Sequence, residues 1–467
     1  MAHPKRANSA LPILLRETGL TGGELARHVN ELGRSQGIRL NYDRTTVAHW
    51  LTGSRPRPPV PALVAQVLSR KAGRLIRPTD TGLVEHTPEP DSPPSAGPFA
   101  GRPDPVDQLL ELCRTDADPV RCGILTRALY ELPDSPTERW PADALPDLQQ
   151  SAAVPLVGRA RTADADFLHG LVEIFAQLDE RYGGGRGRQA LAACLRHDAV
   201  RYLVSVAPPE LGARLLTATA QLTHRLAGMH LDMSAHGAAQ QYHRAALALA
   251  HRADDRDTYA RILSSMSEQA SLLRHDHYAL ELAVAAVDSA GTFVAADTHA
   301  LVLTRRGVAR AVCGDMPGAM ADMYRAASHL DPDARTPESP LAHPRSDLYH
   351  QWARLYESQG SHPRAATALQ SSLQHRNDPW SRTYALTQAR LARLLVRIGH
   401  LEAACKHTAA FLDQQHHFDS AQVRQTLAQL HQQFRPFHRQ ASARTVLQRL
   451  DAAQAAYTDA VRAVALS

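Results

Sequence analysis

The chain of 467 residues has few cysteines, few aromatic side chains and no long hydrophobic run. Its five cysteines are odd in number, scattered and without a C-x-x-C pair, which argues against a disulfide framework and a structural zinc site. No apolar run approaches the ~20 residues that span a bilayer, and the apolar stretch near the start is too short for a signal peptide. We therefore expect a cytoplasmic protein that binds no metal and no membrane.

The sequence also shows no arrangement that indicates catalysis. The glycine-rich stretch Tyr182–Arg188 lacks the Gly-Lys-Ser/Thr of a phosphate-binding loop, and no predicted strand precedes it. A turn that ends a helix is the better interpretation. No serine, cysteine or carboxylate arrangement suggests a reaction, so we expect neither an enzyme nor a cofactor.

Alanine and leucine recur throughout, while isoleucine is scarce, and this mixture favours helices over a large sheet. We predict an all-α protein in four parts. They are a helix-turn-helix domain (1–83), an extended linker with seven prolines (84–105), a helical connecting region (106–160) and a helical repeat domain (161–467).

The repeat domain shows a period near 40 residues. Small residues that open predicted helices stand at spacings of 40, 40, 46, 39 and 39, namely at Ala239, Ala279, Ala319, Ala365, Ala404 and Ala443. Three of them follow a glycine by five residues, at Gly314, Gly360 and Gly399. The long interval contains a turn-rich insertion at 331–344. This pattern predicts an α-solenoid that resembles tetratricopeptide (TPR) repeats.

The repeat period also aligns four polar residues of the predicted first helices: Ser265, Arg305, Gln351 and Arg390. The first helices of TPR repeats line a concave groove, so this stripe is a candidate site for a peptide, a small molecule or a protein partner. A solvated edge is the alternative, because arginine is abundant in this chain.

The first 77 residues carry 13 Lys/Arg and 4 Asp/Glu, whereas the whole chain has a net charge of +5. The N-terminal part therefore holds +9, and the remaining 390 residues sum to −4. A basic end on a mildly acidic body is typical of a protein that meets a polyanion at that end.

The basic part contains a helix-turn-helix pattern. Leu11–Thr18 predicts a first helix, and Thr21 with Glu24 forms a capping box that opens a second. A third helix begins after Asp43 and ends before Gly53, with Val47, Trp50 and Leu51 on one face. Such a helix can enter the major groove of double-stranded DNA. We predict DNA contacts from Arg44, Thr45, Thr46 and His49, with Thr21, Arg55 and Arg57 beside them. The alternative is a small helical cap with a solvated basic face.

Leu25-Ala26 followed by Val47-x-x-Trp50-x-x-Gly53-x-x-Pro56 resembles the XRE-type helix-turn-helix. The whole chain is similar to actinobacterial XRE-type regulators with C-terminal TPR repeats, through that motif and the stretches 178–185, 226–229, 238–242 and 262–267. The resemblance implies a sequence-specific transcriptional regulator of development or secondary metabolism. Twenty residues separate Ala26 from Val47, about twice the compact spacing. Either the second helix is extended, or residues 33–41 form a loop beside the DNA that carries Arg34 and Arg39.

Two classes of function follow. The first is a DNA-binding regulator that works as a homodimer, with a dimer or signal site in the repeats. The final helices are one candidate for the dimer contact, through Leu427, Leu430, Phe434 and Leu447. The second is a TPR adaptor or scaffold whose basic end binds a protein, or binds nucleic acid without specificity.

Overall fold

The computed structural model describes residues 7–35, 38–84, 104–118, 120–133, 140, 158–292, 294–330, 344–376 and 378–465. Within these ranges the chain is helical apart from turns and one isolated β-bridge between Arg159 and Val206. The predicted all-α class is therefore confirmed. Nearly all of the predicted linker (84–105) and of the insertion (331–344) lies outside the described residues. No helix among those described is long and apolar enough to cross a membrane.

The N-terminal helices form a unit with its own core, which we call the head. It comprises α1 (Ala10–Thr18), α2 (Gly22–Ser35), α3 (Arg44–Leu51), α4 (Val60–Ala72) and the 3-10 turn η1 (Thr79–Thr81). Leu11, Leu25 and Leu68 are fully buried between these helices. The predicted capping box is present, since the Thr21 amide donates to Glu24 Oε2 at 2.9 Å and the Glu24 amide donates to Thr21 Oγ1 at 3.3 Å. The local patterns of the sequence thus place the helices of the head correctly.

A second group of helices follows: α5 (Pro105–Ala117), α6 (Cys122–Thr126), α7 (Thr162–Tyr182), α8 (Gly184–Cys194) and α9 (Val200–Leu203), with a π-helical turn at Leu195–Ala199. Gly183 separates α7 from α8 as predicted, although the glycines after it lie inside α8. Val106, Leu109 and Cys113 of α5 belong to the same hydrophobic core as α10 and α11. At least this part of the predicted connecting region is therefore built into the repeat domain.

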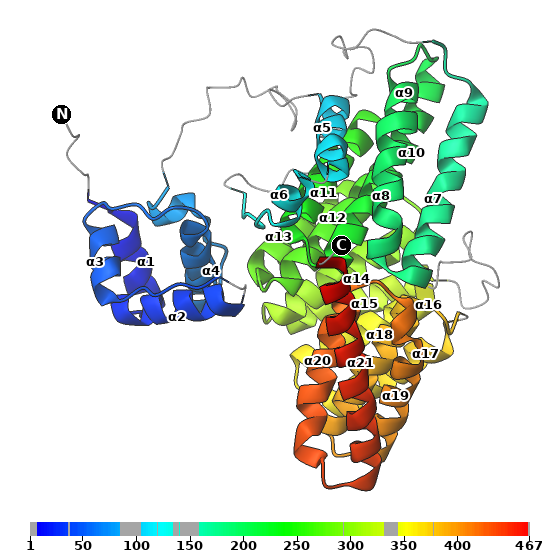
Figure 1. The fold of residues 1–467 in the computed structure, drawn as a ribbon. Coiled ribbons are helices and arrows are strands. Elements are labelled where there is room, and N and C mark those ends of the chain that lie inside the picture. Colours follow the sequence, from blue (N-terminus) through cyan, green and yellow to red (C-terminus); the bar gives the residue numbers. More distant parts are fainter. Residues whose placement is uncertain are drawn as a thin grey trace.

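The remaining helices form six antiparallel pairs, which we call the solenoid (Figure 1). The pairs are α10 (Pro209–Asp232) with α11 (His236–Arg252), α12 (Arg256–Leu272) with α13 (Asp276–Ala290), α14 (Ala296–Val312) with α15 (Met316–His329), α16 (Pro344–Ser358) with α17 (His362–Gln374), α18 (Arg382–Arg397) with α19 (Leu401–Gln414), and α20 (Ala421–Phe434) with α21 (Ala441–Ala465). Each of the six periodic alanines is buried in the first turn of the second helix of its pair. The period read from the sequence is therefore the period of the solenoid.

In the first five pairs, the turn inside the pair uses a left-handed residue. Gly314, Gly360 and Gly399 stand at this position with φ of 93°, 71° and 85°. The two earlier pairs place Ser234 and Arg274 there, with φ of 61° and 65°. Glycine adopts this conformation without the clash that a Cβ atom brings. The spacing of five residues between glycine and alanine thus reflects the backbone geometry of the turn.

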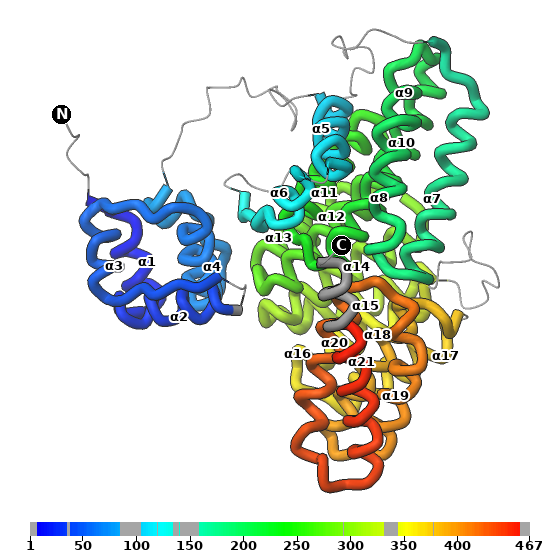
Figure 2. Tube along the Cα trace, in the orientation of Figure 1, coloured from blue at the N-terminus to red at the C-terminus, as the bar shows by residue number. Residues whose placement is uncertain are grey.

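The two ends of the helical series meet, so that α7 lies beside α18 (Figure 2). The Asp419 amide donates to the Tyr182 carbonyl at 2.7 Å, and the Gly185 amide donates to the Asp419 carbonyl at 3.0 Å. Four side chains of the last pair that we considered for a dimer contact are buried inside the chain: Leu427, Leu430, Phe434 and Leu447. These four side chains are therefore not available for a dimer contact, because α18, α19 and the last pair itself already cover them, while a dimer contact through other residues of the final helices stays a prediction.

Candidate nucleic-acid interface and solenoid cavity

Helix α3 begins with a side-chain cap. Asp43 Oδ1 accepts hydrogen bonds from the amide and the hydroxyl of Thr46, both at 2.8 Å. These hydrogen bonds lower the pKa of Asp43, because they stabilise its charged form. The cap fixes where the helix starts and therefore which residues form its first turn.

One face of α3 packs on the head and the other faces solvent. Val47 is fully buried, Trp50 is 3% exposed, and the Trp50 ring meets Tyr42 edge to face at 5.3 Å between ring centroids. Arg44 and His49 lie on the exposed face, together with Thr45 and Ala48. The helix thus holds its polar side chains outward on a rigid base.

The connection from α2 to α3 is longer than the three to four residues of a compact helix-turn-helix. The structure resolves the alternatives that the sequence left open, because α2 extends to Ser35 and includes Arg34, while exposed Arg39 follows in the non-helical segment 38–43. Asn30 fixes this segment to α2 by accepting from the Tyr42 amide at 2.9 Å and donating to the Tyr42 carbonyl at 2.8 Å. The longer connection is therefore anchored at its α3 end.

The seven predicted DNA-contacting residues fall into two groups. The hydroxyls of Thr21 and Thr46 donate to Glu24 and Asp43 within the helix caps. The other five side chains are exposed: Arg44, Thr45, His49, Arg55 and Arg57. Arg55 and Arg57 follow α3 in the segment that leads to α4.

The head docks on the solenoid through α4 and the segment after it. Gln66 Nε2 donates to the Leu273 carbonyl at 2.8 Å, and Arg77 forms an ion pair with Glu281 at 2.8 Å. Helix α3 lies on the side of the head that points away from the solenoid (Figure 1). We did not predict this contact from the sequence, and it leaves the exposed face of α3 uncovered by the described solenoid.

The first helices of the pairs enclose a cavity of about 2020 Å³. Helices α4 and α7 and residues 126–130 also contribute to its wall. Of the four predicted groove residues, Ser265 and Arg390 line the cavity. Gln351 is buried, and the Arg305 side chain is 13% exposed and pairs with Glu268, so neither forms a solvated edge. The predicted stripe thus lies at the cavity, with two members behind its surface.

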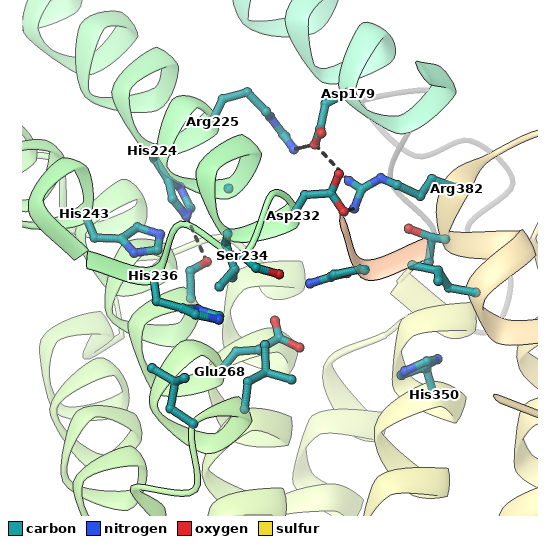
Figure 3. A pocket seen from close by; sticks show the side chains of 18 of the residues that line it. Asp179, His224, Arg225, Asp232, Ser234, His236, His243, Glu268, His350 and Arg382 are labelled. Atoms are coloured by element: carbon teal, nitrogen blue, oxygen red, sulfur yellow. Dashed lines mark hydrogen bonds and ion pairs between the residues drawn. The ribbon is translucent and has the colours of Figure 1, made fainter. Parts of the chain in front are cut away.

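An ion-pair cluster lines the cavity where α7, α10 and α18 meet (Figure 3). Arg382 donates to Asp179 Oδ2 at 3.1 Å and to Asp232 Oδ1 at 2.7 Å, while Arg225 lies 3.5 Å from Asp179. Burial raises the pKa of Asp179 even though these guanidinium groups oppose the shift. We call these four residues the Arg382 cluster. Sequence reasoning missed it, because its members are far apart in the chain.

The opposite end of the cavity is rich in arginine. Helix α18, which contains no acidic residue, lines it with Arg390, Arg393 and Arg397, and α16 adds Arg354. We call these four arginines the basic end. Arg390 pairs with Glu357 at 2.8 Å, whereas Arg393 donates to the neutral amide oxygen of Gln429 at 2.7 Å. Positive charge therefore exceeds negative charge here.

Five histidines line the cavity: His224, His236, His243, His275 and His350. Burial lowers the pKa of all five, to about 4 for His243 and to about 3 for His275. They are therefore neutral at pH 7. His275 lies at the start of α13, where its ring stacks on Tyr130. The described residues contain no group of three or more His, Cys, Asp or Glu that could hold a metal ion.

These features define an all-helical protein in which a small N-terminal helical domain is followed by stacked helix pairs. Residues 11–84 match the family model described as the SP15 N-terminal domain. The matched residues extend from α1 to just beyond η1 and stop before the helix pairs. A search of curated proteins finds no match to this chain. The family model identifies neither an XRE-type head nor TPR repeats, so that resemblance stays a prediction.

Proposed function

We propose that the protein is a sequence-specific transcriptional regulator that reads double-stranded DNA with α3. The observation that carries this proposal is the exposed face of α3, where Arg44, Thr45 and His49 stand opposite the buried Val47 and Trp50. A recognition helix needs one packed face and a first turn whose side chains reach base edges. An arginine there can donate two hydrogen bonds to guanine.

The charge and the docking of the head support the same proposal. Residues 1–77 carry a net charge of +9, which favours a phosphate backbone. Arg55 and Arg57 follow α3 and supply cations beside it, where the phosphates flanking a groove would lie. Because the head meets the solenoid through α4, a duplex can approach α3 without a clash with the described solenoid.

The XRE resemblance assigns the same helix to DNA and leaves signal binding to the repeats. We propose that the solenoid holds a ligand in its cavity and joins two chains into a homodimer. A single small head buries only about 600–1,000 Å² on DNA, at the low end for specific complexes. Two linked heads gain affinity through effective concentration without new contacts. Paired half-sites should therefore appear in the DNA footprint.

The test selects binding sites from random DNA with the full chain and then compares variants on the selected site. We expect Arg44→Ala to weaken binding by about 1–3 kcal/mol and to relax the preference at one base pair. Lys71→Ala is the matched control, because Lys71 is an exposed cation at the end of α4, away from α3. Failure to select any sequence would favour the adaptor function. An equal loss on all sequences would make Arg44 a phosphate contact.

A further inference from the structure

We propose that the basic end of the cavity binds an extended acidic peptide, which deepens the ligand-binding role given to the solenoid in the proposed function. The four arginines of the basic end come from α16 and α18, and the glutamine-rich face of α20 stands beside them. The family match and the helix-turn-helix pattern both lie in the head and therefore say nothing about the basic end of the cavity.

The basic end has more cations than its carboxylates neutralise. Glu268 pairs with both Arg305 and Arg354, and Glu357 pairs with Arg390. Arg393 has only the neutral partner Gln429, and within the described residues no ion pair involves Arg397. Two carboxylates thus pair with three of the five guanidinium groups. Arg393 is half-buried, and a half-buried arginine without a counterion is unfavourable, while Arg397 adds an exposed charge close by. An anionic ligand would supply the missing negative charge.

The pKa shifts of two of these arginines agree with the excess of positive charge at the basic end. Burial lowers the pKa of Arg354 to about 10, and the neighbouring charges of Arg305 and Arg390 add to this effect while Glu268 opposes it. Burial and the charge of Arg397 also lower the pKa of Arg393. A bound carboxylate would relieve this crowding, because an opposite charge favours the protonated guanidinium.

The size and lining of the cavity favour a peptide over a small anion. Its 2020 Å³ exceeds the roughly 300–1,000 Å³ of a small-molecule site. Gln422, Gln425 and Gln429 present amide groups, which both donate and accept and so match the needs of a peptide backbone. From Arg390 to Arg397 the helix rises by about 10 Å, and an extended peptide covers that length with about three residues. Acidic side chains on one face of such a peptide can therefore reach successive arginines.

The experiment measures fluorescence anisotropy of labelled hexaglutamate and labelled hexaglutamine with the full chain and without DNA. We expect hexaglutamate to bind at least about tenfold more tightly than hexaglutamine. The variant Arg393→Gln/Arg397→Gln should lose about tenfold in hexaglutamate affinity. The control Arg325→Gln/Arg439→Gln removes the same charge from two exposed arginines outside the cavity and should bind as the parent does. Circular dichroism melting confirms that each variant is folded.

Three results would overturn the proposal. Hexaglutamate could bind no better than hexaglutamine, or the two double variants could lose affinity equally, which would mean nonspecific attraction to the surface. Pyrophosphate at a similar concentration could displace hexaglutamate completely, which would assign the site to a small anion. Because the assay contains no DNA and leaves Arg44 unchanged, its failure is distinct from a failure of DNA recognition.

Discussion

Helix α3 of the head and helix α18 of the solenoid both contain arginine and no acidic residue, yet Arg44 of α3 and the ion-paired arginines of α18 lie in opposite surroundings. Arg44 of α3 is exposed, whereas the side chains of Arg382 and Arg390 of α18 are 13% and 27% exposed and contact carboxylates. Water and salt screen an exposed charge, so its interactions are weak and fade within about one Debye length. A buried charge needs a specific partner, because removal from water costs several kcal/mol.

The two surroundings suit different partners. An exposed arginine on a packed helix can attract any polyanion and obtains specificity only from direct contacts with base edges. The buried arginines of α18 already have carboxylate partners at the N-terminal end of the helix, in the Arg382 cluster. Toward its C-terminal end the partners become neutral or are missing. This change of partners along one helix distinguishes the structural ion pairs at its N-terminal end from the candidate ligand site at its C-terminal end.

The largest effect is expected from removing the buried ion pairs at the N-terminal end of α18. Arg382→Ala leaves the carboxylates of Asp179 and Asp232 buried with much less compensation, so the free energy of unfolding should fall by about 3–5 kcal/mol. Arg397→Ala, at the exposed end of the same helix, should change it by about 0.5 kcal/mol or less. Urea unfolding followed by circular dichroism measures both. Equal losses would mean that burial of the partner carboxylates does not determine how much each arginine contributes to the free energy of unfolding.

The second-largest effect is expected from acid, which should destabilise the solenoid more than the head. The pKa of buried His243 is about 4 against an ordinary value of 6.5, so between these values the unfolded chain binds more protons than the folded chain. The solenoid should therefore lose stability as pH falls from 6.5 toward 4, by about 1.4 kcal/mol per pH unit for each such histidine. His28 and His49, the described histidines of the head, are not buried.

Hydrogen exchange at pH 7 and pH 5, resolved by peptide, checks this expectation. Solenoid peptides should exchange faster at the lower pH, after correction for the intrinsic exchange rate, while head peptides should keep their protection. His243→Gln should reduce the acid sensitivity of the solenoid, because glutamine does not titrate. A head that opens first in acid would contradict the distinction between buried and exposed histidines.

Local and distant features differ in how far the sequence predicts them. The cap at Asp43, the capping box and the buried alanines depend on residues close in sequence, and the structure bears them out. The docking of the head rests on Arg77 and Glu281, which are 204 residues apart, and no local pattern marks such a pair. The repeat period aligned Arg305 with Ser265, but it could not show that Arg305 pairs with the cavity-lining residue Glu268 and does not itself line the cavity.

The smallest effect is expected from two substitutions in the solenoid that alter no charge. Gly360 and Ser234 occupy equivalent left-handed positions, and a Cβ atom at Gly360 would meet nothing within 4 Å. A left-handed residue other than glycine costs roughly 1–2 kcal/mol, and about 0.4–1 kcal/mol is offset because glycine makes the unfolded chain more flexible. Gly360→Ala should thus destabilise by about 1 kcal/mol or less, and Ser234→Gly should stabilise by a similar amount.

Thermal melting of the two variants and of the parent measures these shifts. Both should lie well below the loss from Arg382→Ala, because each changes one backbone position and leaves every ion pair in place. The opposite signs matter more than the sizes, since they come from one backbone conformation occupied by two residue types. If Ser234→Gly destabilised the chain, the Ser234 side chain would contribute more than its backbone strain costs, and the two turns would not be equivalent.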